Sequence, residues 1–197
     1  KNANGDITVH NDLTITASGP TFNMKTHDLT VTGNFLMSNG IFSGDEGTGN
    51  SHTITGNFTL EAGNFNAESN SYDVDGNLTL NGGTYTASSS TLDIAGNWDD
   101  SGGSFTGGTG TITMSGVATK TIKTGASNKF NDLTVSGIAL TESDNDIEIG
   151  GELDISGTLT VAPGDQLTFT GLNKNHTING GTLTVNTSPA VSSILDF

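Results

Sequence analysis

A short pattern of alternating apolar and polar residues recurs along the whole chain and ends each time in glycine. Its form is close to Leu-x-Val-x-Gly, and its glycines are Gly33, Gly56, Gly76, Gly96, Gly116, Gly137, Gly157 and Gly180. The differences between successive glycine numbers are 23, 20, 20, 20, 21, 20 and 23. A period in this range, filled with two-residue alternation, predicts a solenoid of stacked β-coils.

Residues 72–91 illustrate one full period. Residues 72–75 alternate apolar and acidic side chains, which predicts a short strand with one face inward. Gly76-Asn77 then turn the chain, and we expect left-handed backbone there because both residue types tolerate it. A second strand over 78–80, a corner at Gly82-Gly83 and a third strand complete the coil. Three strands per coil predict a roughly triangular cross-section.

These patterns predict an all-β fold, a single parallel β-helix over residues 1–197. We expect about eight coils of roughly 20–23 residues with three short strands each. With strands of successive coils ~4.8 Å apart, such a rod is on the order of 40 Å long. The chain contains no cysteine, so its stability must come from stacking rather than from disulfides.

The charge of the chain excludes one class of partner. The net charge is −15, with six Lys and no Arg. Nucleic-acid binding needs a cationic surface that displaces counterions from phosphates, so we expect no nucleic-acid partner. No apolar run is long enough to cross a bilayer, so we expect no membrane insertion. This composition fits a secreted or surface-exposed prokaryotic protein, which gives an extracellular or cell-surface localisation.

One corner of the predicted rod carries asparagine in four successive coils: Asn34, Asn57, Asn77 and Asn97. Stacked identical amides can hydrogen-bond along the rod, which predicts a structural corner ladder. Four Asn-x-Ser/Thr triplets leave glycosylation as an alternative role: Asn57, Asn77, Asn175 and Asn186.

An acidic column gives the candidate metal site. Asp73 and Asp93 occupy the same position in adjacent coils, and Asp75 lies two residues along the same face. Carboxylates this close repel one another, so a divalent cation bridges them or their protonation changes. Calcium is therefore a possible cofactor. The alternative is a row of solvated carboxylates, which we favour.

Two other departures from the repeat carry charge. Asp100 and Lys120 replace apolar residues at one strand position in neighbouring coils, which would stack them as an ion pair. We favour the alternative, a bulge with both side chains in water, because Val117 indicates a one-residue shift. The segment 142–148 resembles the start of a calcium loop but has Ile147 in place of the expected glycine, so we favour a strand with outward acids.

No arrangement of residues in the sequence predicts a reaction, and we expect no enzyme. His52 and His176 stand in the leucine column, where we expect packing at a strand edge, and no Ser or Cys nucleophile pattern accompanies them. Proton-abstracting lyases on β-helices typically use a basic residue, often Arg, which is absent here. Asp99-Asp100 resembles a pair in galacturonan hydrolases, but their companion Gly-His-Gly and Arg-Ile-Lys segments have no counterpart.

Two binding functions remain as alternatives. A carbohydrate-binding or polysaccharide-processing β-helix would line a cleft with Trp98, Tyr85 and Asp99-Asp100, and burial of both aromatic side chains would oppose it. An ice-binding solenoid would use ranks of Thr-x-Thr such as 30–32 and 53–55. Aspartates replace threonine at 73–75, which interrupts that face.

Several segments resemble the degenerate repeats of large prokaryotic cell-surface proteins, the adhesin-like and filamentous-haemagglutinin-like β-solenoids. They are Phe130-Asn-Asp-Leu-Thr-Val-Ser-Gly137, Leu153-Asp-Ile-Ser-Gly-Thr-Leu-Thr-Val161 and Gly180-Gly-Thr-Leu-Thr-Val185. The resemblance covers most of the chain. It implies a parallel β-helix with an extracellular structural or adhesive role, and it carries over no site residue.

The alternation runs almost from one end of the sequence to the other. It starts by Ile7 and Val9, continues through Leu183 and Val185, and is followed by an apolar tail to Phe197. We see no pattern for a capping helix, so we expect the terminal coils to pair with neighbouring repeats of a longer chain or end to end with other copies. The expected function is a stalk, shaft or filament subunit, with surface polysaccharide as a possible partner.

Overall fold

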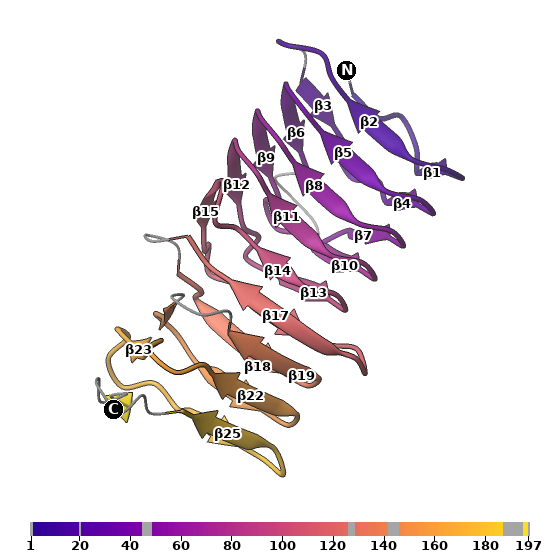
Figure 1. The fold of residues 1–197 in the computed structure, drawn as a ribbon. Helices are drawn as coiled ribbons and strands as arrows, with labels where there is room; N and C mark the ends of the chain where they lie inside the picture. Colours follow the sequence, from indigo (N-terminus) through magenta and orange to yellow (C-terminus); the bar gives the residue numbers. More distant parts are fainter. Residues whose placement is uncertain are drawn as a thin grey trace.

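The computed structural model describes residues 2–19, 21–44, 49–125, 129–141, 146–186 and 195–196, and its secondary structure there consists of strands without helices. Successive coils stack along one axis from the N-terminal to the C-terminal end (Figure 1). All strand pairs between coils are parallel. The predicted all-β parallel β-helix is therefore confirmed. Over the described ranges, no helix is long and apolar enough to cross a membrane.

Two sides of the rod are continuous nine-stranded sheets, which we call sheet B and sheet C. Sheet B consists of β1 (Ile7–Val9), β4 (Leu29–Val31), β7 (Ser51–Ile54), β10 (Ser71–Val74), β13 (Thr91–Ile94), β16 (Thr111–Met114), β18 (Asp132–Val135), β21 (Leu153–Ile155) and β24 (Thr177–Ile178). Sheet C consists of β2 (Leu13–Ile15), β5 (Phe35–Met37), β8 (Phe58–Leu60), β11 (Leu78–Leu80), β14 (Trp98–Asp99), β17 (Thr119–Lys123), β19 (Ile138–Thr141), β22 (Thr158–Val161) and β25 (Thr182–Val185).

The third side is split into two shorter sheets. Sheet A consists of β3 (Thr21–Asn23), β6 (Ile41–Ser43), β9 (Asn64–Asn66), β12 (Thr84–Thr86) and β15 (Ser104–Thr106). Sheet D consists of β20 (Ile147–Ile149), β23 (Leu167–Phe169) and β26 (Leu195–Asp196). In the coil between β15 and β20, this side has only Phe130, which forms an isolated bridge to Ile149 of β20 within the described residues. Three strands per coil is therefore the rule, with this coil as an exception.

The alternating residues point inward and outward as the sequence predicts. In β10, Tyr72 and Val74 are buried whereas Asp73 is exposed. Each inward position stacks on an inward position of the next coil, since Tyr72 pairs with Leu92 and Val74 with Ile94. The core is thus a set of apolar columns parallel to the rod axis, which explains why a chain with only 31% hydrophobic residues forms one.

The column inside sheet A is aromatic. Neighbouring rings stack with centroid separations of 5.8, 4.5, 4.9 and 5.9 Å and interplanar angles of 1–28°. The rings belong to Phe22, Phe42, Phe65, Tyr85 and Phe105. Aromatic pairs in such geometry each contribute roughly 0.5–1.5 kcal/mol beyond the burial of their area. This column fixes the vertical register of the coils on the third side.

In the regular coils, Gly56, Gly76 and Gly96 are required by close contact between coils and not by left-handed backbone, which corrects the expectation at Gly76-Asn77. Two later glycines of the pattern, Gly116 and Gly180, do adopt left-handed backbone, with φ of 75° and 74°. Gly76 is absent from the left-handed positions, which include Gly63 and Gly83 at the second corner, with φ of 91° and 69°. The Gly76 N–H donates to the Gly56 carbonyl oxygen at 3.2 Å. A Cβ at Gly76 would lie 2.5 Å from that same oxygen. A side chain therefore cannot fit at this corner without separating two coils.

A four-residue insertion, residues 115–118, enlarges one corner. Before it, Ile94 pairs with Met114, as the regular repeat requires. After it, Trp98 pairs with Ile122, where the regular repeat would place Ala118. The predicted one-residue shift at Val117 is therefore wrong. Val117 is 97% exposed, so the insertion turns the corner outward and removes this side chain from the core.

The glycine contact yields a stability prediction. We expect Gly76→Ala to destabilise the protein by roughly 1–3 kcal/mol because the methyl group overpacks against the previous coil. Gly5→Ala is the matched control, since its Cβ would meet no atom within 4 Å, and it should change stability by less than about 0.5 kcal/mol. Urea unfolding followed by fluorescence of Trp98, the single tryptophan, measures both. Equal effects of the two substitutions would contradict the contact.

Candidate functional site

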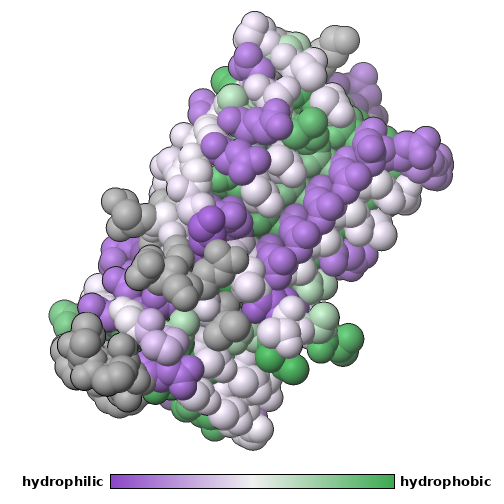
Figure 2. Space-filling view, viewed as in Figure 1, coloured by the Kyte–Doolittle hydropathy of each residue, from purple (hydrophilic) through white to green (hydrophobic). Residues whose placement is uncertain are grey.

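The corner between sheets B and C holds the asparagine ladder. The Asn57 N–H donates to Asn34 Oδ1 at 2.9 Å, the Asn77 N–H to Asn57 Oδ1 at 2.8 Å, and the Asn97 N–H to Asn77 Oδ1 at 2.8 Å. Each side-chain oxygen thus accepts a backbone N–H of the following coil. The sequence analysis predicted instead that the side-chain amides would bond to one another. Figure 2 shows a hydrophilic stripe that follows this corner along the rod.

The ladder has different residues at its two ends. Asp12 begins it, because its Oδ1 accepts the Asn34 backbone N–H at 2.7 Å and the Asn34 side-chain amide at 3.1 Å. Thr121 ends it by donating its N–H to Asn97 Oδ1 at 2.9 Å. The four-residue insertion precedes Thr121, so the ladder stops where the corner changes shape. A backbone N–H at the corner that the ladder of the sheet does not serve needs an acceptor, and these side chains supply one in each coil from Asn34 to Thr121.

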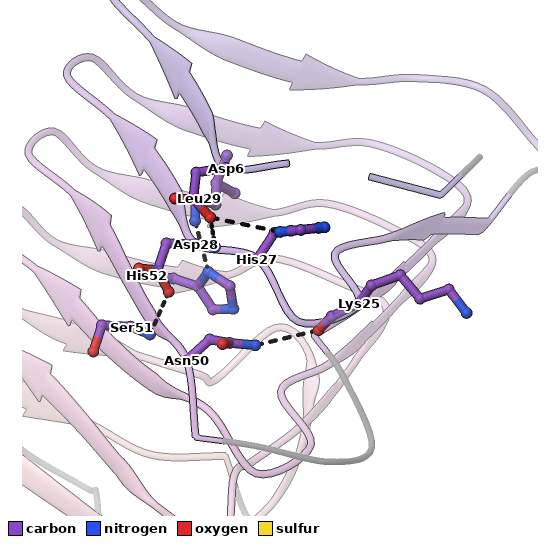
Figure 3. Close-up of polar contacts among 8 residues, drawn as sticks. All are labelled: Asp6, Lys25, His27, Asp28, Leu29, Asn50, Ser51 and His52. Carbon is purple, nitrogen blue, oxygen red and sulfur yellow. Dashed lines mark hydrogen bonds and ion pairs between the residues drawn. The ribbon is translucent and has the colours of Figure 1, made fainter. Parts of the chain in front are cut away.

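A second ladder, of carboxylates, lies before sheet B (Figure 3). The Asp28 N–H donates to Asp6 Oδ1, and the Ser51 N–H donates to Asp28 Oδ1, both at 3.0 Å. His27 Nδ1 lies 3.7 Å from Asp6 Oδ1. The sequence analysis missed this ladder. The sequence feature that could have revealed it is an aspartate at the start of a sheet B strand, repeated one coil later. The same bond recurs where the Glu152 N–H donates to Asp132 Oδ1 at 2.6 Å.

His52 lies in the core, which corrects the expectation of packing at a strand edge. It is 1% exposed, and its ring lies 4.7 Å from the Tyr72 ring and 6.4 Å from the Phe42 ring. Its Nδ1 accepts the Leu29 backbone N–H at 3.0 Å. Desolvation lowers the pKa of His52 to about 4, although the Asp28 carboxylate opposes this shift. The imidazole is therefore neutral at pH 7.

The structure places two of the three predicted acidic residues side by side. Asp73 and Asp93 are direct neighbours in the parallel ladder. Desolvation raises the pKa of Asp73, and repulsion from Asp75 and Asp93 raises it further. Asp75 lies beyond the end of β10 and is exposed. Within the ranges that the structure describes, no three His, Cys, Asp or Glu side chains are grouped closely enough to hold a metal ion. Calcium stays a prediction.

Asp100 and Lys120 are both buried, at 0% and 1% exposure, so the prediction that they point into water is wrong. They do not stack either, because Asp99 pairs with Lys123 and the Asp100 N–H donates to the Lys123 carbonyl, which places Asp100 away from Lys120 in the register. Asp100 Oδ1 accepts the Gly125 N–H at 2.6 Å. Each side chain instead anchors backbone of a neighbouring corner or connection.

Lys120 holds the inserted corner from inside. Its Nζ donates to the carbonyl oxygens of Gly116 and Ala118, both at 2.9 Å, and these residues flank Val117. Desolvation lowers the pKa of Lys120, and the Asp93 carboxylate partly opposes this. A buried ammonium is tolerated here because it donates hydrogen bonds to two carbonyl oxygens of the inserted corner.

The aromatic residues of the carbohydrate hypothesis are buried. Trp98 is 0% exposed and Tyr85 is 1% exposed, and both belong to the core. Asp99 points outward, and its Oδ2 lies 3.7 Å from Lys123 Nζ. A cleft lined by Trp98 and Tyr85 is therefore not formed by these residues, and this opposes the carbohydrate alternative.

The acidic segment 142–148 is described only from Asp146 onward. Glu142 and Asp144 lie outside the described residues. Glu148 lies in β20, between buried Ile147 and Ile149, as the preferred strand interpretation predicts. Asp146 Oδ1 accepts the Gln166 backbone N–H at 2.7 Å, which makes it another corner acceptor.

No family model, curated protein or solved structure has detectable similarity to this chain.

The asparagine ladder predicts a difference between two substitutions at one position. Asn77→Ala removes the acceptor for the Asn97 N–H and should cost about 1 kcal/mol of unfolding free energy. Asn77→Asp keeps a side-chain oxygen there, as Asp12 does at the start of the ladder, and should cost less. Hydrogen exchange at the Asn97 amide, measured with urea unfolding, compares them. Equal protection of Asn97 in both variants would contradict the ladder.

Melting temperatures can distinguish carboxylate repulsion in the acidic column from calcium binding there. In chelator at pH 7, Asp73→Asn should raise the melting temperature because it removes a carboxylate that Asp75 and Asp93 repel. The raised pKa means that the wild-type carboxyl takes up a proton as the pH falls, so this gain should shrink in acid.

Calcium should raise the melting temperature of the wild type and not of Asp73→Asn if it bridges the column. Asp154→Asn is the control, since Asp154 occupies the same column but pairs with Thr134 and Thr177. Calorimetry that detects neither calcium heat nor stabilisation would leave solvated carboxylates as the answer.

Proposed function

We propose that this chain is a structural rod of the cell exterior, acting as a stalk, adhesin shaft or filament subunit. The observation that carries the proposal is the continuity of sheets B and C, whose nine strands each run from β1 and β2 to β24 and β25. The resemblance of its repeats to those of prokaryotic surface solenoids supports the same role. Its task is then mechanical, to hold two ends apart and present a repetitive acidic surface.

The direction of the hydrogen bonds supports a mechanical function. In a β-helix the bonds between strands run along the rod axis, so a pull on the two ends loads them directly. Each coil bonds to its neighbours only, and its corners add side-chain bonds such as Asn77 N–H to Asn57 Oδ1. Resistance is therefore distributed over many equivalent units, which suits a shaft.

The apolar columns at the first coil support assembly along the axis. Ile7, Val9, Leu13 and Ile15 face the core but are only half buried, whereas Leu29 and Val31, the counterparts of the first two, are 1% and 0% exposed. Stacking of another coil on β1 and β2 would bury this surface. We propose that this coil comes from a longer chain or from a second copy joined end to end.

Pulling single molecules tests the shaft. Coils of about 20 residues that yield one by one should lengthen the chain in steps of about 70 Å, since an extended residue spans roughly 3.4 Å. The measurement is force spectroscopy with the two termini tethered. Release of the whole chain in one step at low force would count against a mechanical role.

Assembly is tested separately. Sedimentation and negative-stain microscopy should show rods that lengthen with protein concentration, and Leu13→Asp should prevent this because it places a charge on the apolar end. Thr14→Asp is the matched control, since Thr14 points outward from the same strand. Monomers at every concentration would contradict end-to-end association of copies. Stacking within a longer chain is tested separately, by adding further repeats to the chain.

A further inference from the structure

Two histidines occupy equivalent positions near opposite ends of the rod. In both places the leucine N–H of the preceding coil donates to the imidazole Nδ1, from Leu29 to His52 at 3.0 Å and from Leu153 to His176 at 3.2 Å. Both coils are longer than the regular coil, with a sequence separation of 23 and not 20 between the bonded positions. The same contact therefore recurs with the same change in coil length.

The regular coil has no imidazole at this contact. The Leu133 N–H, one coil before Leu153, donates to the backbone carbonyl of Glu152 at 2.9 Å. A carbonyl accepts a hydrogen bond at any accessible pH, but an imidazole nitrogen accepts one only while it is unprotonated. A ring nitrogen at this contact thus makes a joint between two coils sensitive to acid.

We propose that His52 and His176 are acid-operated latches that hold the terminal coils to the central rod. With Nδ1 accepting, the neutral ring carries its proton on Nε2. Protonation of Nδ1 turns the acceptor into a donor that faces the leucine N–H, and the two donors repel. The joint between β4 and β7 then opens at its start, as does the joint between β21 and β24, whereas the coils between them have no histidine at this position.

The surroundings of His52 set how acidic the solution must be. Asp28, before β4, is the carboxylate that attracts a proton to the ring, and Tyr72 of β10 and Phe42 of β6 enclose it with aromatic surface. In Figure 3, Lys25 points away from the imidazole, and His27 is directed at Asp6. Desolvation outweighs the attraction of Asp28, which is why the pKa of His52 falls to about 4.

His176 is the more accessible latch. Its ring is half buried and lies 4.0 Å from the Phe169 ring of β23. Lys174 stands two residues before it, and Asp154 of β21 pairs with Thr177 beside it.

The direction of the pH effect at His52 follows from its lowered pKa. The unfolded histidine binds a proton more readily than the folded one between about pH 6.5 and pH 4. The stabilisation from the neutral ring is complete above that window and is lost as the pH falls through it. The opening equilibrium of the joint should therefore rise up to tenfold per pH unit, by roughly 300-fold in all.

Hydrogen exchange of the full chain, followed by mass spectrometry from pH 7 to pH 4 and corrected for intrinsic rates, tests the latches. We expect protection of β1 to β6 to fall with pH while β10 to β16 stay protected. His52→Gln keeps a neutral acceptor and should abolish this excess loss, whereas His10→Gln, at an exposed histidine, should retain it. Equal pH dependence in wild type and His52→Gln, or loss of all coils together, would overturn the proposal.

A second measurement does not depend on a variant folding. Nitrogen chemical shifts of the wild-type imidazoles should show the Nε2–H form of His52 at pH 7 and no titration above about pH 5. His176 should show the same tautomer, since its Nδ1 accepts the Leu153 N–H. A His52 ring that takes up its proton near pH 6.5, with the coils still fully protected, would equally overturn the latch.

Discussion

Each coil of this protein must lie on the previous one at the distance of a backbone hydrogen bond, and the rest of the structure follows from this constraint. It is most severe at the corner between sheets B and C, where Gly76 N–H meets the Gly56 carbonyl oxygen at 3.2 Å. Glycines such as Gly56, Gly76 and Gly96 at this corner let the strands on either side approach to ~4.8 Å and stack their side chains into columns. The narrow apolar columns and the aromatic stack of sheet A are consequences of that approach.

Turning a corner interrupts the ladder, so each coil needs an acceptor for an N–H that the sheet no longer serves. The chain supplies it with three kinds of side chain: the amide of Asn57, the carboxylate of Asp28 and the imidazole of His52. The geometric task is the same, but the response to solution conditions differs. The amide does not titrate, whereas the imidazole stops accepting once it is protonated. The choice of acceptor therefore decides which joints between coils are permanent and which respond to acid.

The places where the period breaks show how far pattern alone can lead. The spacing of the glycines located the exceptions at Asp73, Asp93, Asp100 and Lys120, but it could not give the register within the enlarged corner. Four extra residues before Thr119 moved Lys120 out of register with Asp100, and both side chains are buried, so neither alternative considered for this pair is correct. An insertion at a corner leaves the alternation on both sides intact, and the alternation is the only signal that a sequence pattern offers.

The sequence by itself determined the fold class, the coil length and the inward set of residues, because a two-residue alternation interrupted by a glycine corner in every period has only one way to bury its apolar face. It also placed the asparagines of one corner above each other. The tertiary structure decided what those side chains bond to, and that Gly76 at this corner serves close approach rather than left-handed backbone. It also placed His52 inside the core with its Nδ1 facing the Leu29 N–H. These features depend on contacts between residues one coil apart in the chain, whose atoms meet only when the coils stack.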